Sequence, residues 1–417
     1  MVYNRIFEMN CRFCNSELKN IFLDLGQSPL ANSYLTHKQL NVPELFYPLC
    51  AYVCSRCFLV QLAKYENPTK IFQKYAYFSS FSRTWLDHVK EFVDNIVAEY
   101  KLTKINQVIE IASNDGYLLK NFQKYQIPVL GIEPAKNISK IAKKNGIPTI
   151  SEFFGQKIAM KLIKKGIKAD VLIAFNVLPH VPELNDFVKG LKRLLSRNGI
   201  LIIQFSAYLP SVIKNKEFDQ IYHEHFSYFS LFTINKILLK YELEIFDVHE
   251  YNVHGGSLRL FIKHKTNKQI SIRDTVVLKI SEELHFGINK LSTYVQFQKE
   301  IEQKKLEIWK LFASVGLNNK QIIAYGAPAK GNTMLNYVGF NKRIINYTVD
   351  TNPHKQGHFL PGTHIPIYNP LKIKKTKPDF ILVLPWNLKD EIVKNLEYVK
   401  KWNCKLLVLT PKIMTIK

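Results

Sequence analysis

Short apolar runs alternate with amphipathic stretches through the middle of the chain. The short runs are uninterrupted, whereas the longer stretches repeat apolar residues at helical spacing. The predicted strands are Gln107–Ile111, Val129–Ile132, Asp170–Phe175 and Ile200–Phe205, and the predicted helices begin at Tyr117 and cover Asn137–Lys144 and Asn185–Leu195. This alternation predicts a parallel, doubly wound α/β sheet, which binds its ligands at the carboxyl ends of the strands.

Helical and antiparallel patterns flank this alternating segment. Apolar residues recur at helical spacing within Ile71–Tyr100, which predicts a helix before the first strand. Tyr241–Lys263 has the pattern of two strands around a turn, which indicates an antiparallel ending to the sheet. The charged stretch Ile270–Phe312 again has helical spacing, and we predict that it is a long helical linker.

The C-terminal part of the chain carries a second strand–loop–helix unit. Gln321–Tyr325 is a predicted strand that leads through Gly326–Asn332 into a helix ending at Tyr337. Ile344–Val349 is the next predicted strand, and Asp350 follows it. This order is typical of a Rossmann-like nucleotide-binding unit, although the loop does not have the Lys-Ser/Thr ending of a P-loop. The unit either contacts the substrate or is only scaffold, and we favour the substrate role.

Length and composition indicate a folded, multi-domain protein. The chain has 417 residues, enough for two or three domains, and 47% of them are hydrophobic. We find no basic and apolar export leader, and no apolar run reaches the roughly 18–20 residues that span a bilayer. We therefore expect a cytoplasmic protein outside the membrane. We also expect a monomer, since the predicted domains can cover one another.

The formal net charge is +24, which raises the question of a nucleic-acid partner. Lysines are spread along the whole chain, and no Arg-rich helix or RNA-binding signature accompanies them. An anionic small substrate such as a nucleotide fits this charge equally well. The pattern therefore does not favour nucleic acid as the partner.

Four cysteines near the N-terminus form two CxxC pairs, Cys11 with Cys14 and Cys54 with Cys57. Each pair can present two thiolates to one ion, and two pairs complete a tetrahedral site for zinc. A chain with no export signal is not expected to form disulfides. Four thiolates leave no open position for substrate, so we predict a structural Zn²⁺ in an N-terminal lobe.

Two acidic residues at the ends of neighbouring predicted strands indicate the cofactor. Glu110 precedes a loop whose only glycine is Gly116, and Glu133 lies where a carboxylate would hold a ribose diol. The loop does not have the three glycines that let a backbone approach a pyrophosphate. A cofactor with a ribose and no pyrophosphate fits better, and we predict S-adenosylmethionine. Another nucleotide is the alternative.

A dense polar cluster, Tyr222-His223-Glu224-His225, follows the predicted strand Ile200–Phe205. Imidazoles beside a carboxylate and a phenol can transfer protons near neutral pH. His180 also follows a predicted strand, so we expect it at the same edge of the sheet. Within this cluster we expect His223 to have a structural role. The alternative is a polar, aromatic loop whose side chains only satisfy one another.

Taken together, these motifs resemble the zinc-containing, S-adenosylmethionine-dependent C-methyltransferases that act on nucleotide-linked deoxy-keto sugars. The similarity runs essentially the full length, and one departure is Pro179, which precedes His180 where the family usually has no proline. The matching segments, in the family's order, are the two cysteine pairs, Tyr77–Ser80, Glu110–Leu119, Gly131–Ala135, Tyr222–His225, His254–Arg259, Gly326–Asn336 and Leu360–Pro366.

The resemblance implies the following organisation. A zinc-binding lobe would cover residues 1–70, a class I, Rossmann-like methyltransferase domain 71–268, a helical linker 269–315 and a second Rossmann-like domain 316–417. The last of these would contribute to binding a nucleotide-linked keto-deoxy sugar.

The same resemblance assigns site residues. It implies that His225 is the catalytic base, that Glu224 orients it or a sugar hydroxyl, and that Tyr222, Tyr77 and His180 are donors near the ketone. The implied cofactor-binding residues are Glu110, Ala112, Asn114, Gly116, Tyr117, Leu118, Glu133, Pro134 and Asn176. The implied substrate-binding residues are Phe78, Ser79, His254, Lys330, Asn332, His354 and Lys355.

The implied reaction is methyl transfer to carbon, which needs a carbon nucleophile. A base beside a ketone supplies one by removing a C–H proton while the oxygen's developing charge is stabilised. The family suggests C3 of a 4-keto sugar, in the biosynthesis of a branched-chain sugar, and C5 is also open to this chemistry. The alternatives are a methyltransferase acting on oxygen or nucleic acid, an NAD-dependent nucleotide-sugar oxidoreductase, and a binding protein without activity.

Overall fold

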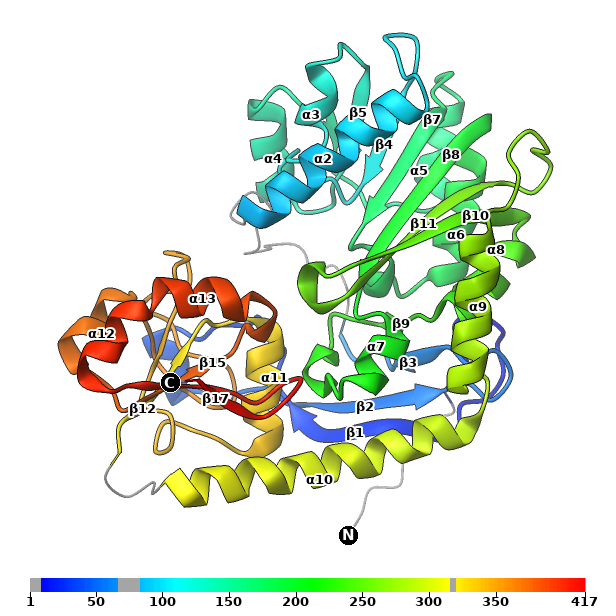
Figure 1. Ribbon diagram of the computed structural model, residues 1–417. Helices are drawn as coiled ribbons and strands as arrows, with labels where there is room; N and C mark the ends of the chain where they lie inside the picture. Colours follow the sequence, from blue (N-terminus) through cyan, green and yellow to red (C-terminus); the bar gives the residue numbers. More distant parts are fainter. Residues whose placement is uncertain (1–8, 67–82, 316–319, 417) are drawn as a thin grey trace.

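Three β-sheets organise the chain (Figure 1), which a computed structural model describes over residues 9–66, 83–315 and 320–416. A seven-stranded sheet occupies the centre of the sequence, and a four-stranded sheet and a six-stranded sheet accompany it. Within the described residues, no helix has both the length and the apolar character needed to cross a bilayer.

The central sheet confirms the predicted doubly wound architecture. Its strand order is β10-β11-β8-β7-β4-β5-β6, with β4 to β8 parallel and the last two strands antiparallel, as predicted. The strands are β4 (Val108–Ile111), β5 (Val129–Ile132), β6 (Thr149–Ile150), β7 (Ala169–Phe175), β8 (Leu195–Ser206), β10 (Leu243–Tyr251) and β11 (Ser257–His264).

Alternate residues of each buried strand pack against helices on opposite faces of this sheet. On β7, Leu172 and Ala174 face one core, and Val171 and Ile173 face the other. This period of two is why an uninterrupted apolar run forms a strand covered on both sides. The first core is covered by α5 (Gln156–Ile163), α6 (Leu184–Leu194) and α8 (Leu231–Lys240), and the second by α2 (Arg83–Glu99), α3 (Lys120–Gln123) and α4 (Lys136–Lys144).

The N-terminal sheet contains one strand that comes from far along the chain. Its order is β1-β2-β3-β9, and all its pairings are antiparallel. The last strand lies directly after the Tyr222–His225 cluster, so this cluster is attached to the N-terminal lobe. The strands are β1 (Asn20–Ser28), β2 (Tyr47–Val53), β3 (Val60–Leu62) and β9 (Ser227–Tyr228), and the 3-10 helix η1 (His37–Asn41) lies between β1 and β2.

The predicted linker consists of two helices, α9 (Asp274–Phe286) and α10 (Leu291–Val315). The break comes at Gly287, whose φ of +89° is a left-handed conformation that ends α9. The longer helix lies along the bottom of the molecule in Figure 1. Its Phe297 stacks on Phe22 of β1, with ring centroids 4.9 Å apart, so the helix is packed and is not a free spacer.

The C-terminal sheet has the order β14-β13-β12-β15-β16-β17 and is parallel except for its last strand. The predicted strand Ile344–Val349 forms only two paired residues. The elements are β12 (Ile322–Tyr325), α11 (Ala329–Val338), β13 (Thr348–Val349), β14 (Ile367–Tyr368), α12 (Leu371–Thr376), β15 (Phe380–Val383), η6 (Trp386–Leu388), α13 (Lys389–Asn395), η7 (Glu397–Trp402), β16 (Lys405–Val408) and β17 (Met414–Ile416).

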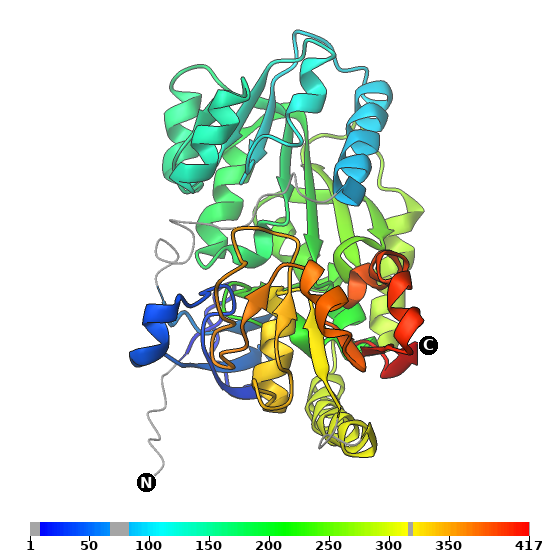
Figure 2. The ribbon, with the colours of Figure 1, turned by 90° about the vertical axis from the view of Figure 1, so that its left-hand side faces the viewer.

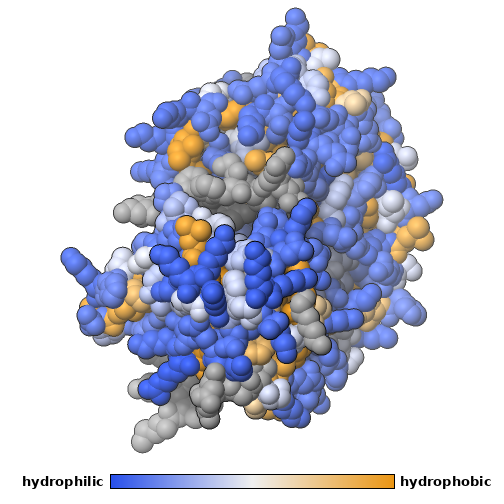
Figure 3. Space-filling model, turned by 60° about the vertical axis from the view of Figure 1, so that its left-hand side comes forward, coloured by the Kyte–Doolittle hydropathy of each residue, from blue (hydrophilic) through white to orange (hydrophobic). Residues whose placement is uncertain are grey.

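The N-terminal lobe and the C-terminal sheet lie side by side beneath the central sheet, as the view in Figure 2 shows. The side of the molecule in Figure 3 is mostly hydrophilic, with hydrophobic residues scattered over it, as expected for a chain of net charge +24. Two short helices join β8 to the Tyr222–His225 cluster. They are α7 (Leu209–Lys214) and η4 (Phe218–Gln220).

Candidate active site and metal centre

The carboxyl edge of the central sheet carries four non-glycine residues in left-handed conformations. Ala112 and Asn114 follow β4, Asn176 follows β7 and Ala207 follows β8, with φ between +48° and +57°. Such values are uncommon outside glycine and cluster at functional sites. These four residues therefore lie at the edge that the sequence predicted as the ligand site.

The loop after β4 is shaped around its single glycine. Gly116 has a φ of +82°, and a Cβ there would lie 2.6 Å from Ile147 Cγ1. The predicted residues Tyr117 and Leu118 are buried just behind this loop. Asn176 joins two strand ends, because its Oδ1 accepts a hydrogen bond of 3.2 Å from the Ser206 N–H.

Glu133, with Pro134 beside it, lies between two loops at the end of β5. Its carboxylate accepts hydrogen bonds from the N–H groups of Asn114, at 3.0 Å, and Ala135, at 2.8 Å. Burial raises the pKa of Glu133 to about 7, and those two N–H groups oppose the rise. The acid predicted to hold a ribose thus also holds the first loop in place.

Buried polar atoms beside Glu133 fit a polar ligand. Glu110 is fully buried, and burial together with the charges of Asp115 and Glu133 holds the pKa of its carboxyl well above the usual range. Both Glu110 oxygens, Ser113 Oγ and Asp115 Oδ1 find no hydrogen-bond partner among the described residues. Buried polar groups normally have partners, so this set suits the polar groups of a bound cofactor. Sequence reasoning missed Ser113 and Asp115.

The central pair of the polar cluster is Tyr222 and His225. His225 Nδ1 lies 3.1 Å from the carbonyl oxygen of Gln220, which can only accept, so Nδ1 carries the proton. His225 Nε2 is then an acceptor, and the Tyr222 hydroxyl lies 2.8 Å from it. Burial and the neighbouring His180 hold the pKa of His225 well below the usual range. The imidazole is therefore neutral and can accept a proton.

His180 joins this pair from the end of β7, in the 3-10 helix η3 (Leu178–His180). Its ring centroid lies 4.8 Å from that of His225, and its Nδ1 donates to the Glu224 carbonyl over 2.8 Å. Burial lowers the pKa of His180 to about 4. The structure therefore brings together the residues that the sequence predicted at this edge, and His180 presents Nε2 as an acceptor.

Glu224 and His223 turn toward the N-terminal lobe. Glu224 is 3% exposed, and its Oε1 accepts a hydrogen bond of 2.7 Å from Asn32. His223 Nε2 lies 3.1 Å from the carbonyl oxygen of Pro48 and donates to it. The position of His223 fits the structural role that we expected for it.

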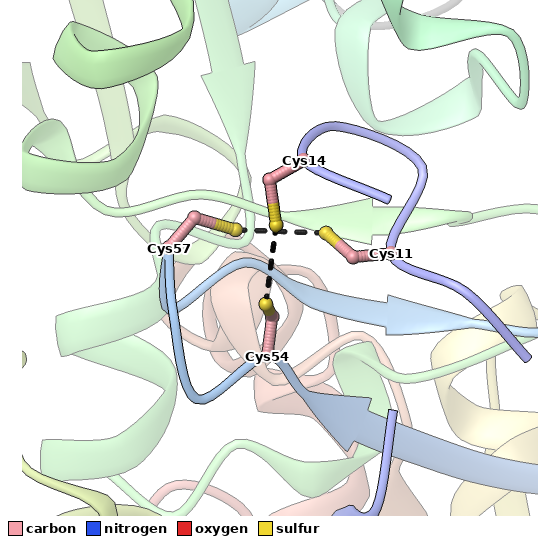
Figure 4. A group of neighbouring side chains, drawn as sticks. All are labelled: Cys11, Cys14, Cys54 and Cys57. Carbon is pink, nitrogen blue, oxygen red and sulfur yellow. Dashed lines mark hydrogen bonds between the residues drawn. The ribbon is translucent and has the colours of Figure 1, made fainter. Parts of the chain in front are cut away.

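The four cysteines of the CxxC pairs meet in one cluster, with their Sγ atoms pointing toward a common centre (Figure 4). These atoms all lie within 4.8 Å of one another, and Cys11–Cys57 and Cys14–Cys54 are each 3.5 Å apart. Zinc–sulfur bonds of about 2.3 Å in a tetrahedron put the sulfurs about 3.8 Å apart. The donor set therefore fits one zinc ion.

Gln61 of β3 connects this cluster to the segment that carries Tyr222–His225. Its Nε2 donates to Cys11 Sγ over 3.2 Å, and its Oε1 accepts from the Arg12 N–H over 2.9 Å. On the same strand, Gln61 pairs with Ser227 of β9, and the Leu62 N–H donates to the Phe226 carbonyl over 3.1 Å. The metal cluster and His225 are thus joined by one strand.

Comparisons with known proteins agree with this geometry. Family models match a zinc-binding domain over residues 11–72, a methyltransferase domain over 75–248 and a C-methyltransferase C-terminal domain over 252–411. The chain is also 32% identical over 385 residues to the C-methyltransferase NovU of Streptomyces niveus, covering 92% of this chain and 91% of that protein. The chain belongs to this C-methyltransferase family. It is an S-adenosylmethionine-dependent C-methyltransferase.

Two further similarities cover only part of the C-methyltransferase. One is to a ubiquinone biosynthesis O-methyltransferase of Pelagibacter ubique, at 22% identity over 30% of this chain and 53% of that protein. The other is to the structure of magnesium protoporphyrin IX methyltransferase from Synechocystis PCC 6803 with bound SAM. That match has 17% identity and a TM-score of 0.35, and it covers 48% of this chain and 99% of that one.

The C-terminal part of the C-methyltransferase contacts η4, just before the Tyr222–His225 cluster, through Trp386, and Lys330 lies over the ring of Trp386. The Lys330 Nζ lies 4.6 Å from the Trp386 ring centroid and donates to Asn387 over 3.2 Å. Trp386 Nε1 in turn donates to Asp219 of η4 over 2.7 Å. Burial lowers the pKa of Lys330, and its positive charge is one cause of the lowered pKa of His225.

The other predicted substrate residues have different surroundings. Both side-chain polar atoms of Asn332 are buried without a partner among the described residues. Lys355 pairs with Asp350, and His354 is exposed. His254 lies in the turn η5 (Val253–Gly255), but its side chain is outside the description, and Tyr77, Phe78 and Ser79 fall in the undescribed segment 67–82.

Arg259 is a buried residue of the C-methyltransferase to which sequence reasoning gave no role. It donates to Gln204 over 2.8 Å and to the Tyr251 hydroxyl over 3.1 Å, and its guanidinium lies 4.3 Å from the Phe92 ring centroid. These contacts join α2 to β8, β10 and β11. In the sequence, Arg259 stood out only as the last residue of the family-like segment His254–Arg259.

Proposed function

We propose that this enzyme transfers a methyl group to a ring carbon, C3 favoured, of a nucleotide-linked 4-keto-deoxy sugar. The product would serve the biosynthesis of a branched-chain sugar. The observation that carries the proposal is the Tyr222–His225 pair. It lies at the carboxyl edge of the cofactor sheet, and η4 just before it contacts the Rossmann-like C-terminal part through Asp219. A substrate with both a reactive carbon and a nucleotide would use both surfaces.

In this proposal His225 Nε2 is the final acceptor of the sugar's C–H proton. The Tyr222 hydroxyl lies on that nitrogen, so it can take the proton from carbon as it gives its own to His225. Burial keeps the imidazole neutral but also makes it a weaker base. A negative enolate formed beside the imidazolium offsets that cost.

Lys330 is the lysine whose positive charge contributes to lowering the pKa of His225. We propose that it stabilises the negative charge that develops on the substrate, or binds the substrate phosphates. The donor role expected for His180 does not fit the tautomer found here, because its single N–H donates to the Glu224 carbonyl. His180 instead supports the Glu224 backbone and packs against the His225 ring.

S-adenosylmethionine, when bound, supplies the methyl group that joins the sugar carbon. Glu133 would accept the ribose hydroxyls, and Glu110, Ser113 and Asp115 would surround the remaining polar groups. Because the pKa of Glu110 is raised, its protonated carboxyl can donate a hydrogen bond at neutral pH. The loop itself is held by the Asn114–Glu133 contact.

Glu133 gives the binding of this cofactor a pH dependence. The ribose hydroxyls prefer the ionised carboxylate, so affinity for S-adenosylhomocysteine should rise as pH increases through about 7, where the Glu133 pKa lies. We expect Kd to change by up to roughly tenfold per pH unit below 7. Calorimetric titration of wild type and Glu133→Gln at pH 6 and pH 8 measures this. A wild-type Kd that does not change with pH would contradict it.

Lys330 should act on the substrate and not on the cofactor. Replacing Lys330 by methionine keeps most of the contact with Trp386 but removes the charge, and we expect KM for the nucleotide sugar to rise about tenfold, the effect of about 1.4 kcal/mol. The matched control is Lys305→Met, since Lys305 also lies over a ring, that of Tyr337, at 4.6 Å. Equal KM values for the two variants would rule out the assigned role.

We assign a structural role to the zinc ion. Four thiolates fill a tetrahedron and leave no position for substrate, and the cluster is linked to the Tyr222–His225 segment through the pairing of β3 with β9. The ion would then fix the N-terminal sheet, to which the strand after His225 is attached.

The proposal is tested by incubating the enzyme with methyl-labelled S-adenosylmethionine and a panel of nucleotide-linked 4-keto-6-deoxy sugars. We expect label in at least one sugar, and none in the same sugar without its nucleotide. Label in a nucleic acid or another small molecule, with none in the panel, would refute the proposed substrate class.

A further inference from the structure

The segment between β1 and η1 joins the N-terminal lobe to the C-terminal part of the enzyme. Leu35 and Phe359 exchange two backbone hydrogen bonds, of 2.9 Å and 2.8 Å. This paired contact fixes the position of the neighbouring residues Asn32 and Tyr34, which are half-buried. Neither residue is in any motif that sequence reasoning singled out.

Asn32 contacts Glu224 of the Tyr222–His225 cluster. Its Nδ2 donates to Glu224 Oε1 over 2.7 Å. Since an ionised carboxylate only accepts, the amide nitrogen has to face Glu224. The Asn32 Oδ1 then faces away from it, toward Tyr34, whose hydroxyl lies 3.1 Å away.

Tyr34 has one hydroxyl proton and two acceptors within reach. Its oxygen lies 2.6 Å from the carbonyl oxygen of Ala327 and 3.1 Å from Asn32 Oδ1. Burial raises the pKa of Tyr34, so the phenol keeps its proton. It donates to one acceptor at a time, and the shorter distance favours Ala327.

Ala327 belongs to the loop that leads into α11. Its N–H donates to Asp350 Oδ2 over 2.8 Å, and its carbonyl also accepts from Lys355 Nζ over 2.8 Å. Both ends of this residue are therefore held by charged side chains, directly before the helix that carries Lys330 and Asn332. A set of short polar contacts thus runs from this loop through Tyr34 and Asn32 to Glu224, and its Tyr34–Asn32 step is a hydrogen bond only when the Tyr34 proton turns from Ala327 to Asn32.

We propose that Asn32 and Tyr34 are positioning residues that set the orientation of Glu224 from loop 326–328, which leads into the helix that carries Lys330. The proposal rests on the proposed function, in which the C-terminal part holds the nucleotide, and on the role expected for Glu224, which is to orient His225 or a sugar hydroxyl. When that loop engages the nucleotide, the Ala327 carbonyl and the Tyr34 proton respond together, and the Asn32 amide carries the change to Glu224. The N-terminal lobe then has a role beyond holding zinc.

The test uses the full-length, zinc-loaded enzyme and the nucleotide sugar that wild type turns over. We expect Asn32→Ala to lower kcat by about 10- to 100-fold, and Tyr34→Phe by less, with KM for S-adenosylmethionine unchanged. In a Glu224→Gln background, Asn32→Ala should cost less than about threefold, because it acts through the missing carboxylate. Tyr125→Phe, which removes a hydroxyl bound to Asp94, is the control and should leave kcat unchanged.

A merely structural role predicts a different pattern. Asn32→Ala would then lower the melting temperature and would cost the same in both backgrounds, and that result would overturn the proposal. Crystal structures of the Asn32→Ala variant with S-adenosylhomocysteine decide the point without turnover: the Glu224 carboxylate should move, and an unmoved carboxylate contradicts the proposal. If wild type methylates no nucleotide sugar, the proposed function fails by itself, and the crystal structures still decide the role of Asn32.

Discussion

Replacing His225 by alanine is expected to lower kcat for methyl transfer about 10³-fold, the usual worth of a general base. The substitution removes Nε2, the atom on which the Tyr222 hydroxyl lies. Adenosylmethionine binding should not change, because His225 is not among the residues around Glu110 and Glu133. The expected pattern is therefore a loss of kcat with an unchanged KM for the cofactor.

The proton-transfer step can be measured separately from methyl transfer. With S-adenosylhomocysteine in place of the methyl donor, wild type should exchange the sugar's C–H proton with deuterated water, and His225→Ala should not. Tyr222→Phe keeps the ring and removes the hydroxyl, so it should slow exchange without abolishing adenosylmethionine binding. Exchange at the wild-type rate in His225→Ala would show that another residue is the base.

Removing zinc is expected to unfold the N-terminal lobe and abolish methyl transfer. Structural zinc contributes on the order of 10 kcal/mol in small zinc domains. The loss would reach the active site because β9, directly after His225 and Phe226, is the fourth strand of that lobe's sheet. We therefore expect activity and the lobe's structure to disappear together during titration with a chelator.

Cysteine variants provide the matched comparison. Cys54→Ala removes one of the four thiolates and should yield protein with less than one zinc per chain and a lowered melting temperature. Cys404→Ala removes a buried cysteine outside the cluster and should keep both the metal and the activity. Full activity in metal-free protein would refute the role assigned to the cluster.

The sequence predicted the longer parallel strands of the central sheet well because strands such as β4 and β7 are buried on both faces. Runs such as Val129–Ile132 are apolar throughout, and their ends agree with the observed strands to within a few residues. The two-residue strands were not predictable. Ser227 and Tyr228 have no periodic pattern of their own, and they form β9 only because Gln61 and Val60 lie opposite them. Pairing over that separation leaves no local signal.

The candidate site was likewise predictable only in part. His180 and His225 could be placed at one edge, since each follows a parallel strand. The direction of their hydrogen bonds could not be predicted, because it depends on the carbonyls of Glu224 and Gln220. Asn32 was likewise out of reach. The role that we propose for Asn32 depends on its contact with Glu224, which lies far away in the sequence.

The central claim is that the methyl group is delivered to a sugar carbon. It is tested most directly by nuclear magnetic resonance of the product formed from carbon-13 methyl-labelled S-adenosylmethionine and the accepted nucleotide-linked keto sugar. We predict a labelled methyl on the ring carbon next to the ketone, C3 in a 4-keto sugar, with the C–H at that position lost. A labelled methyl on oxygen would contradict the account.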